Sequence, residues 1–125
     1  MKKIFIFLLL LILLAACSSS STKPTNPQVT IETSAGKEFK VIVESNPTTG
    51  YHWEVDGELN TNIVDLVNKE YKSTSDPNLV GGGGVDVWTF KAIGAGETKI
   101  KLGYYPPSNT ITDPEKTETF TVIVK

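Results

Sequence analysis

Short segments of alternating apolar and polar residues follow one another along most of this chain, and turn residues separate them. Successive side chains of an extended strand point to opposite faces, so this alternation predicts half-buried β-strands. Trp88 and Phe90, for example, share one face of such a strand. The expected strands are Gln28–Thr33, Lys37–Ser45, Tyr51–Val55, Val85–Ala92, Glu97–Tyr105 and Lys116–Val124.

One segment, Ile63–Tyr71, has an ambiguous pattern, because its apolar residues fit either a short helical turn or an irregular strand. We predict a strand there. No segment has helical periodicity over three turns, and about seven short strands in ~100 residues indicate an all-β protein. We therefore predict an immunoglobulin-like antiparallel β-sandwich, and the pattern leaves its topology open.

A compact turn separates the second and third expected strands. Pro47 fixes its own φ, Gly50 can adopt the positive φ that ends a tight loop, and the Asn46 side chain can bond the backbone. No side chain from Asn46 to Gly50 is charged, so this loop could enter a narrow cleft without removing water from an ion. The candidate binding residues of the turn are Asn46, Pro47, Thr48, Thr49, Gly50 and Tyr51.

Two further loops are candidates for binding. The first contains Gly81, Gly82, Gly83 and Gly84, which are followed by neither the lysine nor the helix of a phosphate loop. It is either a flexible hairpin connection or bare backbone that lies against another protein. The second contains Tyr105, Pro106 and Pro107. Loops of an immunoglobulin-like sandwich gather at its two ends, so all three loops could share one rim.

The N-terminus has the pattern of a secretory signal peptide, because Lys2 and Lys3 precede the unbroken apolar run Ile4–Ala16. As a helix this run would span roughly 20 Å, which is less than the ~30 Å hydrocarbon core of a membrane. Its last residues, Leu14-Ala15-Ala16-Cys17, resemble the lipobox of bacterial lipoproteins, in which the cysteine receives diacylglycerol. We predict that residues 1–16 are a cleaved lipoprotein signal peptide.

Cys17 is the only cysteine of the chain, and lipid attachment would use a thiol that has no internal disulfide partner. The alternative is an ordinary signal peptide followed by a chance cysteine. Ser18–Pro27 is polar and rich in proline, which predicts a flexible tether, so residues 17–27 would connect the lipid to one domain at 28–125. We expect a membrane-anchored lipoprotein of the cell envelope that faces the periplasm or the cell exterior.

Charge and composition exclude several functions. The formal net charge is -2 and charges of both signs are interspersed, which argues against nucleic acid as a partner. His52 is the only histidine, and the sequence offers it no evident nucleophile. The carboxylates Asp56, Glu58 and Asp65 match no calcium-loop spacing. We therefore expect a monomer that is not an enzyme and binds no metal or cofactor.

The motifs, taken in chain order, closely resemble the chagasin family of cysteine protease inhibitors. The matching segments are Asn46-Pro47-Thr48-Thr49-Gly50-Tyr51 with Trp53, Gly82-Gly83-Gly84 with Trp88-Thr89-Phe90-Lys91-Ala92, and Gly96 with Ile100-Lys101-Leu102-Gly103-Tyr104. The resemblance implies an immunoglobulin-type sandwich whose three adjacent loops enter the active-site cleft of papain-like cysteine proteases reversibly. Thr48, Thr49 and Gly50 would then lie nearest the catalytic cysteine of the enzyme, and Gly81–Gly84 would make main-chain contacts along the cleft.

The third loop departs from the family pattern, Tyr-x-Arg-Pro-Trp. Pro107 matches, but Pro106 replaces the arginine and Ser108 replaces the tryptophan. Interface arginines and tryptophans can each contribute about 2 kcal/mol or more, so weaker inhibition or a different target is expected unless Tyr105 substitutes for them. The alternative function is an immunoglobulin-like adhesion or envelope-assembly module that binds another protein or a glycan.

Overall fold

The computed structural model describes residues 28–74, 76–78, 81–108 and 113–125. The predicted signal peptide, Cys17 and the tether lie outside these residues. A 3-10 helix, η1 (Pro47–Thr49), accompanies seven strands. The strands are β1 (Val29–Thr33), β2 (Glu38–Ser45), β3 (His52–Val55), β4 (Val64–Ser73), β5 (Gly84–Ala92), β6 (Gly96–Tyr105) and β7 (Lys116–Val124).

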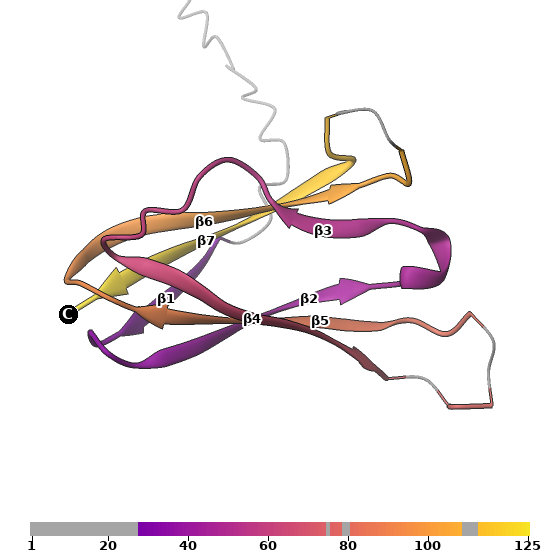
Figure 1. The fold of residues 1–125 in the computed structure, drawn as a ribbon, viewed down its shortest axis with the longest axis horizontal. Helices are drawn as coiled ribbons and strands as arrows, with labels where there is room; N and C mark the ends of the chain where they lie inside the picture. The colour runs from indigo at the N-terminus through magenta and orange to yellow at the C-terminus, as the bar shows by residue number, and fades with distance from the viewer. Residues whose placement is uncertain (1–27, 75, 79–80, 109–112) are drawn as a thin grey trace, which may run out of the picture.

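The strands form two sheets that pack face to face (Figure 1). One sheet has the order β1-β7-β6-β3 and the other has the order β2-β5-β4. This arrangement confirms the predicted sandwich of about seven strands. The pairing between β1 and β7 is parallel, whereas the other four pairings are antiparallel. The chain passes from β1 in one sheet to β2 in the other, so β1 is not constrained to form a hairpin with its neighbour.

The core lies between the sheets and contains the residues that the alternating pattern turned inward. Trp53, Phe90, Ile100 and Leu102 are fully buried, and Trp88 is 2% exposed. Phe90 stacks between Phe39 and Trp88, with ring centroids 5.7 Å and 6.4 Å away. Large aromatic side chains contribute most to cores of this size, because each buries a large apolar area.

The ambiguous segment is a strand, β4, as predicted. A register shift lies between Leu66 and Asn68, and Val67 is half exposed there. A β-bulge of this kind adds one residue to a strand and reverses the alternation beyond it. The bulge therefore explains why the apolar pattern of this segment fits neither a regular strand nor a helix.

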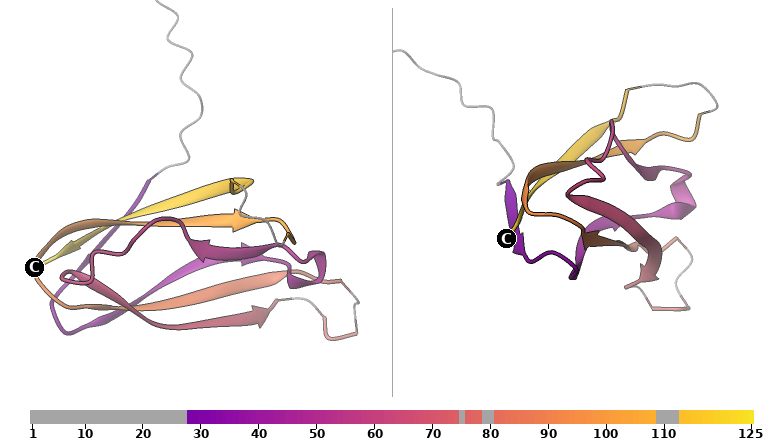
Figure 2. Two further views of the ribbon diagram at one scale, coloured as in Figure 1. Left: turned by 45° about the horizontal axis from the view of Figure 1, so that its top comes forward. Right: turned by 60° about the vertical axis from the view of Figure 1, so that its left-hand side comes forward.

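The first turn, the loop that contains Gly81–Gly84 and the loop after β6 lie at the end of the sandwich opposite the C-terminus (Figures 1 and 2). Strands β2, β4 and β6 run toward this end, and β3, β5 and β7 run away from it. The predicted gathering of the three loops at one rim is thus correct. In the described part of the chain, no helix has the length and apolar character needed to cross a membrane.

Candidate functional site

The first loop is ordered by its own hydrogen bonds. The Asn46 carboxamide oxygen accepts from Thr48 N at 3.3 Å and from the Thr48 hydroxyl at 2.6 Å. The Thr49 hydroxyl donates to Asn46 O at 2.7 Å and accepts from Tyr51 N at 3.3 Å. These bonds form an N-cap on η1 and use both threonine hydroxyls. These hydrogen bonds therefore fix the conformation of an exposed, uncharged loop before any partner binds.

Gly50 ends this loop in the left-handed conformation, with φ 80°, as predicted. Its amide donates to Pro47 O at 3.1 Å. A β-carbon built on Gly50 would lie 2.8 Å from Cβ of Pro107, which belongs to the third loop. Only glycine satisfies both requirements at this position, and the close approach joins the first loop to the third.

A second contact joins the first loop to the glycine-containing loop. The Asn46 carboxamide nitrogen donates to Gly81 O at 3.5 Å. Thr74 closes the glycine loop at its base, because its amide and its hydroxyl both donate to Gly83 O at 3.4 Å. The structure thus places all three candidate loops side by side, with the first loop in contact with both neighbours.

The glycines of this loop have different structural roles. Gly81 has φ 81° and open space around its Cα, so this position favours glycine only because its φ is positive. Gly84 is buried at the start of β5, where a β-carbon would collide with the Tyr71 hydroxyl and Lys72 O. Gly84 therefore has a packing role, and the glycines of this loop that are not buried are Gly81, Gly82 and Gly83.

An aromatic stack supports the first loop from below. The Tyr51 ring stacks on Tyr104 with centroids 5.2 Å apart, and the Tyr104 ring contacts Trp53 at 4.9 Å. The Trp53 indole nitrogen donates to Glu44 O at 2.7 Å, which ties β3 to the end of β2. Both ends of the loop are thus fixed to the body. Tyr104 belongs to the matched family motif but was not among the predicted binding residues. Lys116, which lies over these rings, was missed because nothing in the pattern distinguished it from an ordinary strand residue.

Tyr105 points away from the rim. It pairs with His52 across β3 and β6, and a β-carbon at Gly103 would lie 2.8 Å from its ring. The Tyr105 hydroxyl donates to Asp56 Oδ1 at 3.4 Å, and Lys101 Nζ lies 2.7 Å from Asp56 Oδ2. Desolvation, followed by the charge of Asp56, raises the pKa of Tyr105, so its hydroxyl stays protonated. Within the predicted third-loop site, Pro107 is the residue that approaches the first loop.

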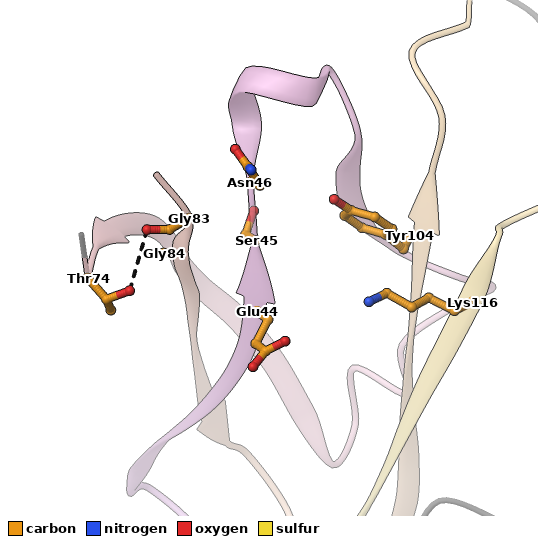
Figure 3. A pocket seen from close by; sticks show the side chains of 8 residues that line it. All are labelled: Glu44, Ser45, Asn46, Thr74, Gly83, Gly84, Tyr104 and Lys116. Atoms are coloured by element: carbon orange, nitrogen blue, oxygen red, sulfur yellow. Dashed lines mark hydrogen bonds between the residues drawn. The ribbon is translucent and has the colours of Figure 1, made fainter. Parts of the chain in front are cut away.

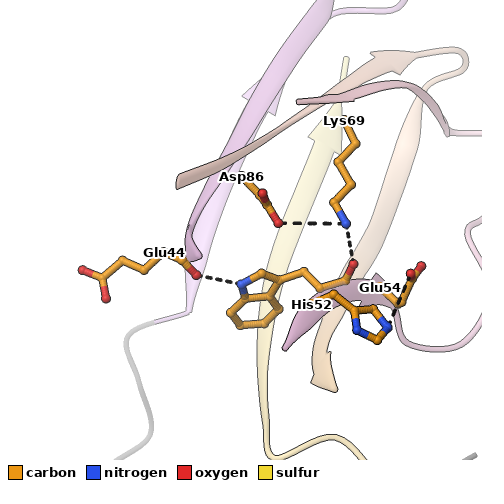
Figure 4. A network of polar contacts seen from close by, with 6 residues as sticks. Glu44, His52, Glu54, Lys69 and Asp86 are labelled. Carbon is orange, nitrogen blue, oxygen red and sulfur yellow. Dashed lines mark hydrogen bonds and ion pairs between the residues drawn. The ribbon is translucent and has the colours of Figure 1, made fainter. Parts of the chain in front are cut away.

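The polar cluster beneath the site positions Trp53 (Figure 4). Lys69 Nζ donates to Trp53 O at 2.7 Å, lies 3.9 Å from Asp86 Oδ2 and is 4.6 Å from the centroid of the Trp88 ring. Lys69 reaches the interior because the β4 bulge pairs it with Trp88, whose side chain faces the core. Asp86 is buried, so removing Lys69 would leave its carboxylate without this ion pair, and the arrangement is a structural network.

His52 has no catalytic partner in the part of the chain that the structure describes. Its imidazole is exposed and lies 3.8 Å from the Glu54 carboxylate (Figure 4). The Tyr105 ring lies next to it. Among the described residues, no group of three or more histidine, cysteine, aspartate or glutamate side chains could hold a metal ion.

Two family models match the chain. The model described as Chagasin family peptidase inhibitor I42 matches residues 32–124, which include all seven strands except the start of β1. The model of the prokaryotic membrane lipoprotein lipid attachment site matches residues 1–18.

Individual relatives agree with the first match. Amoebiasin-2 of Entamoeba histolytica is 29% identical over 97 residues, which cover 77% of this chain and 77% of the relative. Amoebiasin-1 of the same organism is 35% identical over 83 residues, which cover 66% and 78%. The crystal structure of the cysteine protease inhibitor EhICP2, also from Entamoeba histolytica, superposes with a TM-score of 0.66 at 28% identity and covers 78% of this chain and 87% of that chain.

Proposed function

This chain belongs to the chagasin family of peptidase inhibitors and carries a lipoprotein attachment motif, and from this premise we propose that it inhibits papain-like cysteine proteases at the cell envelope. Inhibition is reversible and non-covalent, and the three loops at one end of the sandwich fill the active-site cleft. The family consists of inhibitors, so the chemistry belongs to the enzyme and this chain contributes shape.

The observation that carries the proposal is the internal bonding of the first loop. Asn46 and Thr49 hold the turn through their side chains, and Gly50 is locked against Pro107. A fixed loop loses little conformational entropy on binding, and an uncharged loop enters a cleft without a large desolvation cost. A 3-10 turn is also not extended through the cleft as a substrate would be, so the enzyme cannot readily cut it.

The loops have different tasks in this proposal. Thr48, Thr49 and Gly50 lie nearest the catalytic cysteine, and Asn46, Pro47 and Tyr51 hold them there. The glycine loop approaches the wall of the cleft with its backbone, mainly through Gly81–Gly83. Pro106 and Pro107 contact the opposite wall, and Tyr105 supports them from the base of the third loop.

The third loop limits affinity. Pro106 and Ser108 offer neither an arginine nor a tryptophan, and the Tyr105 hydroxyl is bound to Asp56 within the inhibitor. Without large anchoring side chains, the first loop and the glycine loop must supply most of the binding energy. We expect inhibition that is weaker than a fully anchored third loop would give, on the order of a thousandfold.

Lipid attachment at Cys17 places the inhibitor at a membrane. Residues 1–16 are removed as the signal peptide, 17–27 form the lipidated tether, and 28–125 form the inhibitory domain. More than one acyl chain, each worth about 0.8 kcal/mol per buried CH₂, gives a stable anchor. The domain then faces the periplasm or the cell exterior, where it meets proteases that approach the envelope.

Titration of residues 18–125 against papain and cathepsin L tests the proposal. We expect active-site-directed competitive inhibition in the submicromolar to micromolar range, and recovery of enzyme activity on dilution. Absence of inhibition at micromolar concentration with both enzymes and with a cysteine protease from the same envelope would reject it and favour an adhesion or assembly role.

A further inference from the structure

A polar groove of about 440 Å³ lies beside the first loop, at the end of the sandwich that carries the three loops (Figure 3). The end of β2 and the start of β5 form one side, and Tyr104 and Lys116 form the other. Its lining residues are Glu44, Ser45, Asn46, Thr74, Gly83, Gly84, Tyr104 and Lys116. A partner that engages the first loop and the glycine loop would therefore cover the mouth of this groove.

Lys116 supplies the only positive charge among the lining residues. Its ammonium group lies 4.9 Å from the centroid of the Tyr104 ring and 5.5 Å from that of Trp53, and it points into the groove (Figure 3). No carboxylate of the described residues lies within ion-pair distance of Lys116. The rings hold the ammonium in place but accept none of its hydrogen bonds in the manner of a carboxylate, so its donors remain available.

Glu44 does not neutralise this charge, although it lines the groove. Its backbone carbonyl accepts from the Trp53 indole at 2.7 Å, and its side chain extends away from that indole (Figure 4). The alternation of β2 gives the same orientation, since Val43 and Ser45 are buried and Glu44 is exposed between them. No ion pair joins the two side chains, so the Lys116 ammonium is not paired with a carboxylate of the described residues.

Ser45 offers the groove a second hydrogen-bond donor beside Lys116. The residue is only 7% exposed and lines the groove. Its hydroxyl makes no hydrogen bond with any other described residue. The oxygen is not one of the fully buried polar atoms that lack a partner, so it remains accessible from the groove and can donate to a bound acceptor.

We propose that this groove receives an acidic side chain from the rim of the target protease, which pairs with the Lys116 ammonium and accepts a hydrogen bond from the Ser45 hydroxyl. The inference rests on the proposed inhibitory function and adds a charged specificity contact to the three loops. A carboxylate fits both donors, because it is acceptor-only and can accept at two oxygens. Lys116 thereby selects proteases that carry an acidic residue at this place on the cleft rim.

Charge reversal at Lys116 tests the contact, and Lys99→Glu is the matched control. Lys99 is exposed on β6 and lies outside the groove and the three loops, so its reversal changes the net charge equally. The enzyme panel consists of papain, cathepsin L and a cysteine protease from the same envelope. With the enzyme of this panel that wild type inhibits most tightly, Lys116→Glu should raise the inhibition constant at least ~30-fold and Lys99→Glu less than ~3-fold. Ser45→Ala should raise it by about 3- to 10-fold, because it leaves the acceptor with one donor fewer.

Lys116→Met and Lys116→Arg separate charge from packing. Methionine keeps an apolar stem over Tyr104 and Trp53, and arginine keeps the charge as well. We expect weakened inhibition with methionine, near-wild-type inhibition with arginine, and a smaller effect of added salt on the methionine variant than on wild type. Equal inhibition by wild type, Lys116→Glu and Lys116→Met would overturn the contact while leaving the inhibitor proposal intact. Failure of wild type to inhibit any enzyme of the panel would overturn both.

Discussion

Gly50 and Pro107 touch so closely that the first and third loops form one unit: a β-carbon added to Gly50 would lie 2.8 Å from Cβ of Pro107. The two residues are far apart in sequence, and neither is buried. Their contact sets the distance between the first loop and the third loop. Changes at either residue should therefore affect inhibition through loop spacing as well as through direct contact.

Gly50→Ala tests this relationship. The substitution adds a Cβ in a left-handed conformation, which costs roughly 1–2 kcal/mol, and it pushes against Pro107. Gly57→Ala is the control, because Gly57 has φ 91° but nothing within 4 Å of its added Cβ. We expect both variants to lower Tm, but only Gly50→Ala to raise the inhibition constant, by about 10-fold or more. Equal inhibition by the two variants would show that the contact with Pro107 does not set the loop position.

Asn46→Ala removes the cap of the first loop. Its side chain accepts from Thr48 N and donates to Gly81 O, so the variant loses the bonds that order the turn and join it to the glycine loop. A lost cap costs about 1 kcal/mol. Asn60→Ala is a matched control, since Asn60 Oδ1 accepts from Asn62 N at 3.2 Å in the loop between β3 and β4. We expect similar losses of stability by thermal denaturation, and weaker inhibition, about 5- to 20-fold, only for Asn46→Ala.

The alternating pattern predicted strands such as β2 well, because buried and exposed residues alternate along them. It could not predict the direction of β1, since pairing partners are set by tertiary contacts that leave no local pattern. It was ambiguous at β4, where the bulge at Val67 turns Lys69 toward Trp88. Chain order and turn chemistry were enough to predict the rim of three loops.

The details of the site depended on side-chain directions that a sequence does not give. Tyr104 and Tyr105 are adjacent, so alternation places them on opposite faces of the strand. Which of the two tyrosines faces the first loop depends on the pairing of β6 with β3. Tyr104 supports the first loop and Tyr105 binds Asp56. Lys116 looked like an ordinary polar residue at a strand start, and only the absence of a nearby carboxylate among the described residues marks it.

Thr49→Asp should weaken inhibition with little effect on the fold. The side chain is exposed, and a carboxylate can still accept from Tyr51 N, although it cannot donate to Asn46 O. In the complex, however, the new charge would enter the cleft without a partner, which costs several kcal/mol. We expect a rise in the inhibition constant of roughly a hundredfold or more and a change in Tm of only a few degrees. Thr30→Asp, an exposed change on β1, controls for net charge, and a collapse of the fold in Thr49→Asp would show that the loop is structural.

Asp56→Asn should change the acid stability of the domain without changing inhibition. The hydrogen bond from Lys101 lowers the pKa of Asp56, and the same bond raises the pKa of Lys101. A lowered carboxyl pKa stabilises the fold above the unfolded value, near pH 4, and this contribution is lost as pH falls through the lowered folded value. The raised lysine pKa gives a contribution to stability that persists until the pH rises through that higher pKa.

The difference in Tm between wild type and Asp56→Asn should therefore be constant from about pH 6 to 9 and shrink below about pH 4. A constant difference at all acid pH values would show that the pair contributes through packing and not through charge. Inhibition at pH 6 should be unchanged, because an asparagine at this position can still accept the hydrogen bond from the Tyr105 hydroxyl.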